Sequence, residues 1–161
     1  MRVYLLRHGI AENGKPGSPD RTRALTAEGK RKLKEVLRTA KAAGVNPNLI
    51  LTSPYVRAAE TAEIAATVLG YKQDVLETSA LVPDGKPTGV WDEVRTHKNM
   101  EELMLVGHQP LFGMLLSHLC NSPSLLVDFK KGAIACVEIE RFGAQPHGVL
   151  RWFLTPKLAV D

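Results

Sequence analysis

The sequence predicts an α/β fold, a three-layer sandwich in which a mostly parallel central sheet carries helices on both faces and ends in a C-terminal β-hairpin. Two observations predict it. Short apolar runs of strand length, such as 49–52 and 103–106, alternate along the chain with longer segments of helical periodicity. Near the C-terminus, 134–139 and 149–154 have the alternating or apolar character of strands and flank a turn that contains glycine, which is typical of a hairpin.

The N-terminal part is predicted to run from strand to loop to helix. Residues 2–7 form the first strand, and 10–25 carry Gly, Pro, Ser, Asp and Arg without periodicity, so we expect a loop that suits contact with a substrate. Thr26 is a candidate N-cap of the following helix, and Gly44 is its expected end.

A second helix is expected to follow the strand at 49–52. Ser53 and Pro54 resemble a helix start, with the serine as N-cap and the proline at the first helical position, and Gly70 is the expected end. The remaining predicted elements are a short strand at 75–76, a helix over 88–98 and a helix marked by leucines between 111 and 119.

Length and composition indicate one globular domain over residues 1–161, with 44% hydrophobic and 24% charged residues. No apolar stretch approaches the length of a membrane span, and the run 3–6 is too short for a signal peptide. We therefore expect a cytoplasmic protein with no membrane partner. Cys120 and Cys136 are expected to be reduced core thiols.

The formal net charge is +4, and much of the positive charge lies in one predicted helix, between residues 30 and 41. No interleaved aromatic residues or nucleic-acid motif accompany it, so a solvated helix face is favoured and no nucleic-acid partner is expected. A mildly basic protein still favours acidic or phosphorylated substrates.

Three predicted strand ends carry cationic or imidazole side chains. Arg7 and His8 follow the first strand, Arg57 follows the second, and His108 follows the strand at 103–106. In an open α/β sheet, ligands bind beyond the carboxyl ends of the strands. Clustering these groups is unfavourable unless an anion joins them, and arginine matches phosphoryl oxygens well. The sequence thus predicts a phosphate pocket.

In four segments the chain resembles the histidine phosphatase, or phosphoglycerate-mutase-like, superfamily, and most of all its small phosphohistidine phosphatase branch. The segments are Arg-His-Gly at 7–9, Arg-Ala-Leu-Thr-Ala-Glu-Gly at 23–29, Ser-Pro-Tyr-Val-Arg-Ala-Ala-Glu-Thr at 53–61 and Gly-His at 107–108. Their order and spacing match over almost the whole chain, which makes the set far more specific than any one motif.

The resemblance implies a two-step reaction. His8 attacks phosphorus as a neutral imidazole, and water hydrolyses the phosphohistidine intermediate. Arg7, Arg57 and His108 hold the non-bridging oxygens. No metal or other cofactor is implied, because the cationic side chains supply the positive charge. The sequence does not identify the group that accepts the hydrogen on the far nitrogen of His8.

Three further residues are candidates for the pocket. Gly9 permits close approach of the backbone to an anion, and Arg23 is expected at the rim, in contact with the phosphate or the substrate beyond it. Asp84 is the nearest candidate for the general acid that larger relatives use, although a turn-forming role in Pro-Asp-Gly explains it equally well.

A phosphoramidate has less need of such an acid, so the expected substrate is a phosphorylated protein, such as a domain that carries phosphohistidine. Two alternatives stay open: a phosphomonoesterase that acts on a small phosphate compound with the same nucleophile, and a non-catalytic module that binds phosphoryl groups.

Overall fold

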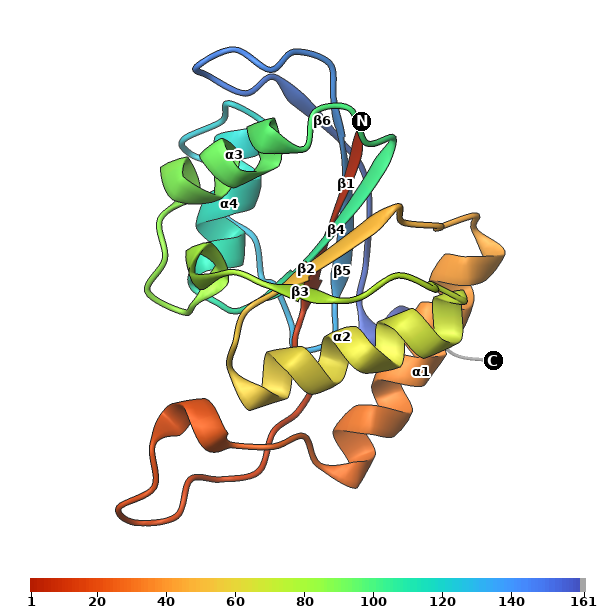
Figure 1. Cartoon of the computed structure of the whole chain (residues 1–161), viewed down its shortest axis with the longest axis vertical. Coiled ribbons are helices and arrows are strands. Elements are labelled where there is room, and N and C mark those ends of the chain that lie inside the picture. Colours follow the sequence, from red (N-terminus) through yellow and green to blue (C-terminus); the bar gives the residue numbers. More distant parts are fainter. Residues whose placement is uncertain (160–161) are drawn as a thin grey trace.

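Six strands form the central sheet in this computed structural model, which describes residues 1–159 (Figure 1). Their order is β3-β2-β4-β1-β5-β6. The parallel part consists of β1 (Arg2–Arg7), β2 (Leu49–Thr52), β3 (Leu76–Glu77) and β4 (Glu102–Gly107). The antiparallel part consists of β5 (Ile134–Ile139), which pairs with β1, and β6 (Gly148–Leu154). The predicted mostly parallel sheet and its C-terminal hairpin are confirmed.

Helices cover both faces of the sheet, as the sequence predicts (Figure 1). One layer consists of α1 (Ala27–Ala42) and α2 (Val56–Leu69), and the other of α3 (Pro87–Thr96) and α4 (Leu111–Leu119). In β1, Val3 and Leu5 pack on the α3–α4 side, whereas Tyr4 and Leu6 pack on the α1–α2 side. Because both faces are buried, the central strands are apolar throughout rather than alternating.

Several predicted helix ends are confirmed. The Thr26 hydroxyl accepts a hydrogen bond from the N–H of Gly29 at 2.9 Å and so caps α1. Gly44 follows the end of α1 with φ +90°, and Gly70 ends α2 with φ +74°, both in the left-handed region that glycine enters without strain.

The predicted start of α2 is wrong. The helix begins at Val56, with Tyr55 as an N-cap residue that makes no side-chain cap. The Ser53 hydroxyl instead accepts the N–H of Tyr55 at 3.2 Å and lies 2.8 Å from Nε2 of His108. Ser53, which the sequence predicts as the N-cap of this helix, therefore stabilises a turn at the end of β2.

Other boundaries shift by one or two residues. The short strand predicted at 75–76 lies at Leu76–Glu77, and the helix predicted over 88–98 is α3, which begins at Pro87, where a proline is favoured at the first helical position. Both cysteines are free, as expected, with Cys136 buried and Cys120 partly exposed.

The segment 10–25 is a loop with a closed base. Ala11 and Leu25 form an isolated antiparallel bridge, and the N–H of Thr26 donates to the Ile10 carbonyl at 2.9 Å. A Cβ on Gly29 would lie 2.3 Å from that same carbonyl oxygen, so only glycine lets α1 pack this closely. Farther along the loop, Asp20–Thr22 form a short 3-10 turn.

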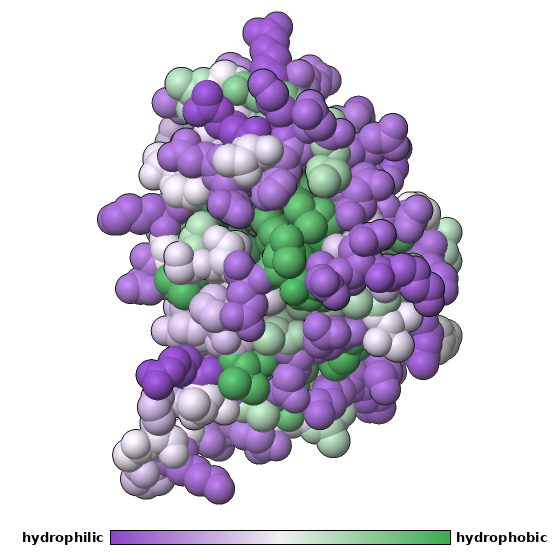
Figure 2. All heavy atoms as spheres, viewed as in Figure 1, coloured by the Kyte–Doolittle hydropathy of each residue, from purple (hydrophilic) through white to green (hydrophobic). Residues whose placement is uncertain are grey.

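Hydrophilic side chains cover most of the face in Figure 2, apart from an apolar area over the sheet between α3 and α2. Along α1, Arg31 pairs with Glu35 and Lys32 with Glu28, which places part of the basic segment on a solvated helix face. Within residues 1–159, no helix has both the length and the hydrophobicity needed to cross a membrane.

Candidate active site

The carboxyl ends of β1, β4 and β2 lie side by side and bring three sequence motifs together. Arg7 of β1 pairs with Gly107 of β4, and the N–H of His8 donates to the Gly107 carbonyl at 2.9 Å. On the other side of β4, the N–H of Ser53 donates to the Val106 carbonyl at 2.9 Å. The predicted meeting of these strand ends is what the sheet order β2-β4-β1 produces.

His8 is 5% exposed, and its ring orientation is fixed by the next residue. Its Nδ1 lies 2.7 Å from the carbonyl oxygen of Gly9. A carbonyl only accepts hydrogen bonds, so Nδ1 carries the hydrogen and Nε2 keeps its lone pair. Nε2 accepts a hydrogen bond from Nε of Arg57 at 3.3 Å. The acceptor that the sequence did not identify is therefore the Gly9 carbonyl.

Gly9 is itself held on two sides. Its N–H donates to the Thr61 hydroxyl at 3.2 Å, and that hydroxyl donates to the Arg57 carbonyl at 2.7 Å. A Cβ on Gly9 would lie 2.7 Å from Cδ1 of Leu33 in α1. Gly9 thus orients His8, and its N–H is engaged by Thr61, a residue that the sequence reasoning noticed only as part of a motif.

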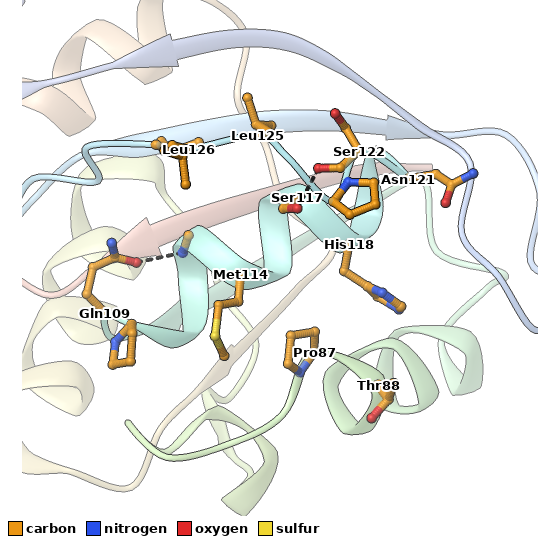
Figure 3. Close-up of a pocket in the computed structure, with 14 residues that line it drawn as sticks. Pro87, Thr88, Gln109, Met114, Ser117, His118, Asn121, Ser122, Leu125 and Leu126 are labelled. Atoms are coloured by element: carbon orange, nitrogen blue, oxygen red, sulfur yellow. Dashed lines mark hydrogen bonds between the residues drawn. The ribbon is translucent and has the colours of Figure 1, made fainter.

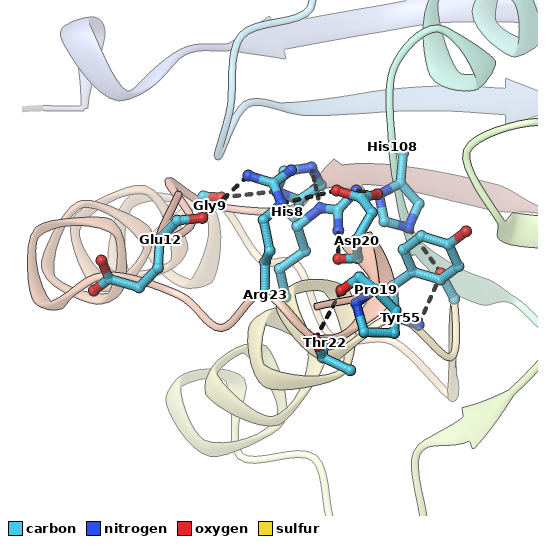
Figure 4. A network of polar contacts seen from close by, with 11 residues as sticks. His8, Gly9, Glu12, Pro19, Asp20, Thr22, Arg23, Tyr55 and His108 are labelled. Atoms are coloured by element: carbon cyan, nitrogen blue, oxygen red, sulfur yellow. Dashed lines mark hydrogen bonds and ion pairs between the residues drawn. The ribbon is translucent and has the colours of Figure 1, made fainter. Parts of the chain in front are cut away.

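Arg57 lies in the first turn of α2 and is 4% exposed. Its guanidinium carbon is 5.1 Å from the centre of the Tyr55 ring, a cation–π arrangement. Nη1 donates to the backbone carbonyl of Asp20 at 3.0 Å, and Nη2 pairs with its carboxylate at 3.1 Å. The Arg57 guanidinium therefore connects the unprotonated nitrogen of His8 to the carboxylate of Asp20, both of which are labelled in Figure 4.

His108 and Arg7 complete the cluster. The His108 ring is 1% exposed and its centre is 5.0 Å from that of His8. Arg7 donates from Nη1 to the Phe129 carbonyl at 2.6 Å. Among the described residues, Nδ1 of His108 and Nε of Arg7 are buried and have no hydrogen-bond partner. Buried polar atoms without partners are uncommon, and next to a cationic cluster they indicate groups that bind a ligand.

Burial and the neighbouring cations keep both imidazoles neutral. Burial, together with the charges of Arg57 and Arg7, lowers the pKa of His8 to about 4, against the hydrogen bond to Gly9. Burial and the neighbours His8 and Arg57 lower the pKa of His108 to about 3. The positive charge of the pocket at neutral pH therefore resides on the arginines.

Asp20 supplies the negative charge in this cluster, and the sequence reasoning missed it. Its carboxylate accepts from Nε of Arg23 at 2.8 Å and from Nη2 of Arg57 at 3.1 Å. Partial burial alone would raise the pKa of Asp20, but these two hydrogen bonds outweigh it and lower the pKa.

Within residues 1–159, no three His, Cys, Asp or Glu side chains gather as a metal site requires.

The comparisons with known proteins agree with this geometry. Residues 3–81 match the model of the histidine phosphatase superfamily, branch 1. An uncharacterized protein of Picosynechococcus is 34% identical over 145 residues, which cover 83% of this chain and 87% of the relative. The chain belongs to the histidine phosphatase superfamily. It is accordingly a hydrolase with phosphatase activity.

Within the histidine phosphatase superfamily, the chain is similar to SixA both in sequence and in structure. Phosphohistidine phosphatase SixA from Escherichia coli is 26% identical over 160 residues, which cover 97% of this chain and 94% of that protein. The structure of the protein histidine phosphatase SixA complexed with tungstate superposes with a TM-score of 0.86 and 25% identity, covering 98% of each chain.

Two of the residues considered for this histidine phosphatase pocket differ in placement. Arg23 reaches the pocket rim through Asp20 and also donates to the Glu12 carbonyl at 3.1 Å. Asp84 lies exposed in the loop between the turn Ser79–Leu81 and α3, and in residues 1–159 its carboxylate has no hydrogen bond or ion pair. Its role as a general acid stays a prediction.

A separate cavity of about 610 Å³ lies along α4 (Figure 3). Gln109 and Pro110, which follow His108, begin its lining, and Met114 and Leu126 extend it over a mostly apolar surface. His8, Arg7, Arg57 and His108 do not line it. The cavity is thus a neighbour of the histidine phosphatase site and not part of it.

The state of His8 predicts a specific NMR result. In ¹H–¹⁵N spectra of the free protein at pH 6, we expect His8 neutral with its hydrogen on Nδ1, and protonation only near pH 4. Exposed His147 provides the comparison in the same spectra. A His8 ring that is protonated at pH 6, or that carries its hydrogen on Nε2, would contradict the structure.

The lowered pKa of His8 also predicts how stability depends on pH. The folded protein keeps this imidazole neutral down to about pH 4, whereas the unfolded chain takes up a proton below about pH 6.5. The free energy of unfolding should therefore fall as the pH drops from about 6.5 towards 4.

Proposed function

We propose that this protein is a phosphohistidine phosphatase that transfers a phosphoryl group from a phosphorylated protein to Nε2 of His8 and then to water. The observation that carries the proposal is the His8 ring. Its hydrogen is held on Nδ1 by the Gly9 carbonyl, and the lone pair of Nε2 faces the guanidinium of Arg57. A neutral imidazole with a fixed tautomer is a competent nucleophile towards phosphorus.

The reaction then has two displacements. In the first, the lone pair of Nε2 attacks phosphorus in line, the bond from phosphorus to the leaving group breaks, and the leaving group departs with its electron pair and takes up a proton. In the second, a water oxygen attacks phosphorus, the electron pair of the N–P bond returns to Nε2, and inorganic phosphate leaves. Arg7, Arg57 and His108 hold the non-bridging oxygens and stabilise the charge that develops on them.

The carboxylate in the pocket supports a nitrogen leaving group. Arg23 and Arg57 hold Asp20 ionised, so it is a poor donor of the proton that an alkoxide leaving group needs. The imidazole of phosphohistidine is readily protonated and depends less on such a donor. The likeness to proteins named as phosphohistidine phosphatases supports the same substrate class.

Asp20 also marks the position of the anion. One oxygen of its carboxylate accepts from Arg23 and the other from Arg57, the arginine that contacts His8, and Figure 4 shows Asp20 close to His8, Arg23 and His108. A phosphoryl group that approaches Nε2 of His8 competes with this carboxylate for Arg57. Substrate binding in this proposal therefore displaces Asp20 from at least one of its ion pairs.

Replacing the nucleophile tests the covalent mechanism. With a ³²P-labelled phosphohistidine protein as donor, the wild type should acquire label that is stable to alkali and lost in acid. His8→Ala should acquire none and should lose turnover by about a thousandfold or more, because the nitrogen that accepts the phosphoryl group in the proposed mechanism is removed. His147→Ala, at an exposed histidine, is the matched control and should label like the wild type. Equal labelling of His8→Ala would exclude the mechanism.

The substrate class is tested by comparing kcat/KM values. A phosphohistidine protein should be hydrolysed with a higher kcat/KM than alkyl or sugar phosphates, because its leaving group needs no strong enzymic acid. If sugar phosphates have the higher kcat/KM, the enzyme is a small-molecule phosphomonoesterase instead. If neither class is hydrolysed and inorganic phosphate still binds, the chain is a non-catalytic binding module.

Removing the internal anion should strengthen phosphate binding. Asp20→Asn is expected to bind inorganic phosphate about two- to fivefold more tightly at low salt, since Arg57 loses a competing ion pair. Isothermal titration calorimetry measures this change. Glu12→Gln removes the same charge from the same loop, where Glu12 points away from His8 in Figure 4, and is the control. Binding by the Asn variant no tighter than by this control would contradict the competition.

A further inference from the structure

Ser53 lies between the turn that precedes α2 and His108 at the end of β4, and the mechanism described above gives it no role. It follows β2, is fully buried, and its hydroxyl oxygen is 2.8 Å from Nε2 of His108. The same oxygen accepts the N–H of Tyr55 at 3.2 Å. This buried hydroxyl is therefore shared between the turn that precedes α2 and the imidazole at the end of β4.

A count of hydrogens decides the direction of the Ser53–His108 bond. A hydroxyl has one hydrogen and two lone pairs, and the N–H of Tyr55 uses one lone pair. Among the described residues, Nε2 of His108 is the acceptor within reach of the hydroxyl hydrogen. If Nε2 donated instead, the serine hydrogen would be buried without a partner, at a cost of about 1–3 kcal/mol. Ser53 therefore donates, and Nε2 accepts.

The neutral His108 ring must then carry its own hydrogen on Nδ1. That nitrogen is buried and has no partner among residues 1–159. The ring lies 5.0 Å from the ring of His8, and Figure 4 shows it facing His8 and Asp20, where the phosphoryl group is expected. An N–H donor without a protein partner beside the nucleophile is suited to a phosphoryl oxygen.

We propose that Ser53 is a positioning residue that holds His108 in its Nδ1–H tautomer, so that a neutral His108 donates a hydrogen bond to a phosphoryl oxygen during transfer to His8. The inference rests on the proposed function for its chemical consequence. The tautomer itself is a property of the free protein and can be tested without a substrate.

The surroundings of His108 explain why the tautomer matters. Its ring centre lies 5.0 Å from that of His8 and 5.1 Å from that of Tyr55. The charges that act on it are those of Arg57, Arg7 and Asp20, of which only Asp20 raises its pKa. Burial, His8 and the two arginines together keep it from becoming an imidazolium, which would donate from both nitrogens. A neutral imidazole has a single N–H group. If Nε2 carried that hydrogen, the N–H would point to Ser53 rather than to the substrate.

The direct test is the tautomer of His108 in ¹H–¹⁵N spectra, where protonated and bare ring nitrogens have well-separated ¹⁵N shifts. In the free wild-type protein at pH 7, Nδ1 of His108 should carry the hydrogen and Nε2 should be bare. Ser53→Ala should move the ¹⁵N shifts of His108 towards a mixture of tautomers, and Ser53→Thr, which keeps the hydroxyl, should restore the wild-type pattern. A wild-type ring protonated at Nε2 overturns the proposal whether or not the variants fold.

Kinetics test the consequence for transfer. With a phosphohistidine substrate, Ser53→Ala should lower kcat/KM about tenfold or more, mainly through kcat, because the donor acts on the charge of the transition state. Ser53→Thr should recover most of the loss. Ser117→Ala, in α4, is the matched control. It removes a hydrogen bond from the Ser117 hydroxyl to the Ser122 carbonyl and should leave kcat/KM unchanged. A Ser53→Ala protein with wild-type His108 shifts and wild-type kcat overturns the proposal. Equal labelling of His8→Ala and the wild type would instead remove the covalent mechanism and leave the tautomer of His108 to be decided by its spectra.

Discussion

The hydrogen bond from Nδ1 of His8 to the Gly9 carbonyl is the constraint on which the pocket depends. It selects the tautomer, and so leaves the lone pair of Nε2 on the side of Arg57. The bond exists because Gly9 is pinned, by the Thr61 hydroxyl on one side and by close packing against Leu33 on the other. Both helices of the α1–α2 layer thus contribute to the orientation of the His8 imidazole at the end of β1.

The charges of the pocket follow from the sheet order. Placing β4 between β1 and β2 brings two arginines and two histidines from separate segments within a few ångströms of one another. Their mutual repulsion is limited in two ways. Burial keeps the histidines neutral, and the Asp20 carboxylate neutralises part of the charge of Arg57 and Arg23. Both effects lower the repulsion within the cluster, and the arginines keep the positive charge that suits an anion.

The sequence predicted the sheet, its hairpin and the meeting of Arg7, His8, Arg57 and His108, because apolar runs locate the strands and motif residues follow them directly. It did not predict the partners of those side chains. Ser53 has the residue type of an N-cap, and only its distance to His108 shows its actual use. Asp20 stands in an aperiodic loop, so nothing local indicates that its carboxylate reaches Arg57, 37 positions away. The hydrogen-bonding role of the Gly9 carbonyl depends on backbone direction, which a residue letter does not encode.

The closed base of the loop 10–25 separates the residue that pairs with Arg57, Asp20, from the residue that acts as nucleophile, His8. The bridge between Ala11 and Leu25, and the bond from Thr26 to Ile10, fix both ends of the loop against α1. Asp20 is carried by the 3-10 turn beyond that base, whereas His8 precedes it in the chain. In the proposed reaction, the residues of the loop alone can therefore absorb a movement of Asp20. Exchange of its carboxylate for a phosphoryl group would then leave the backbone that orients His8 unchanged.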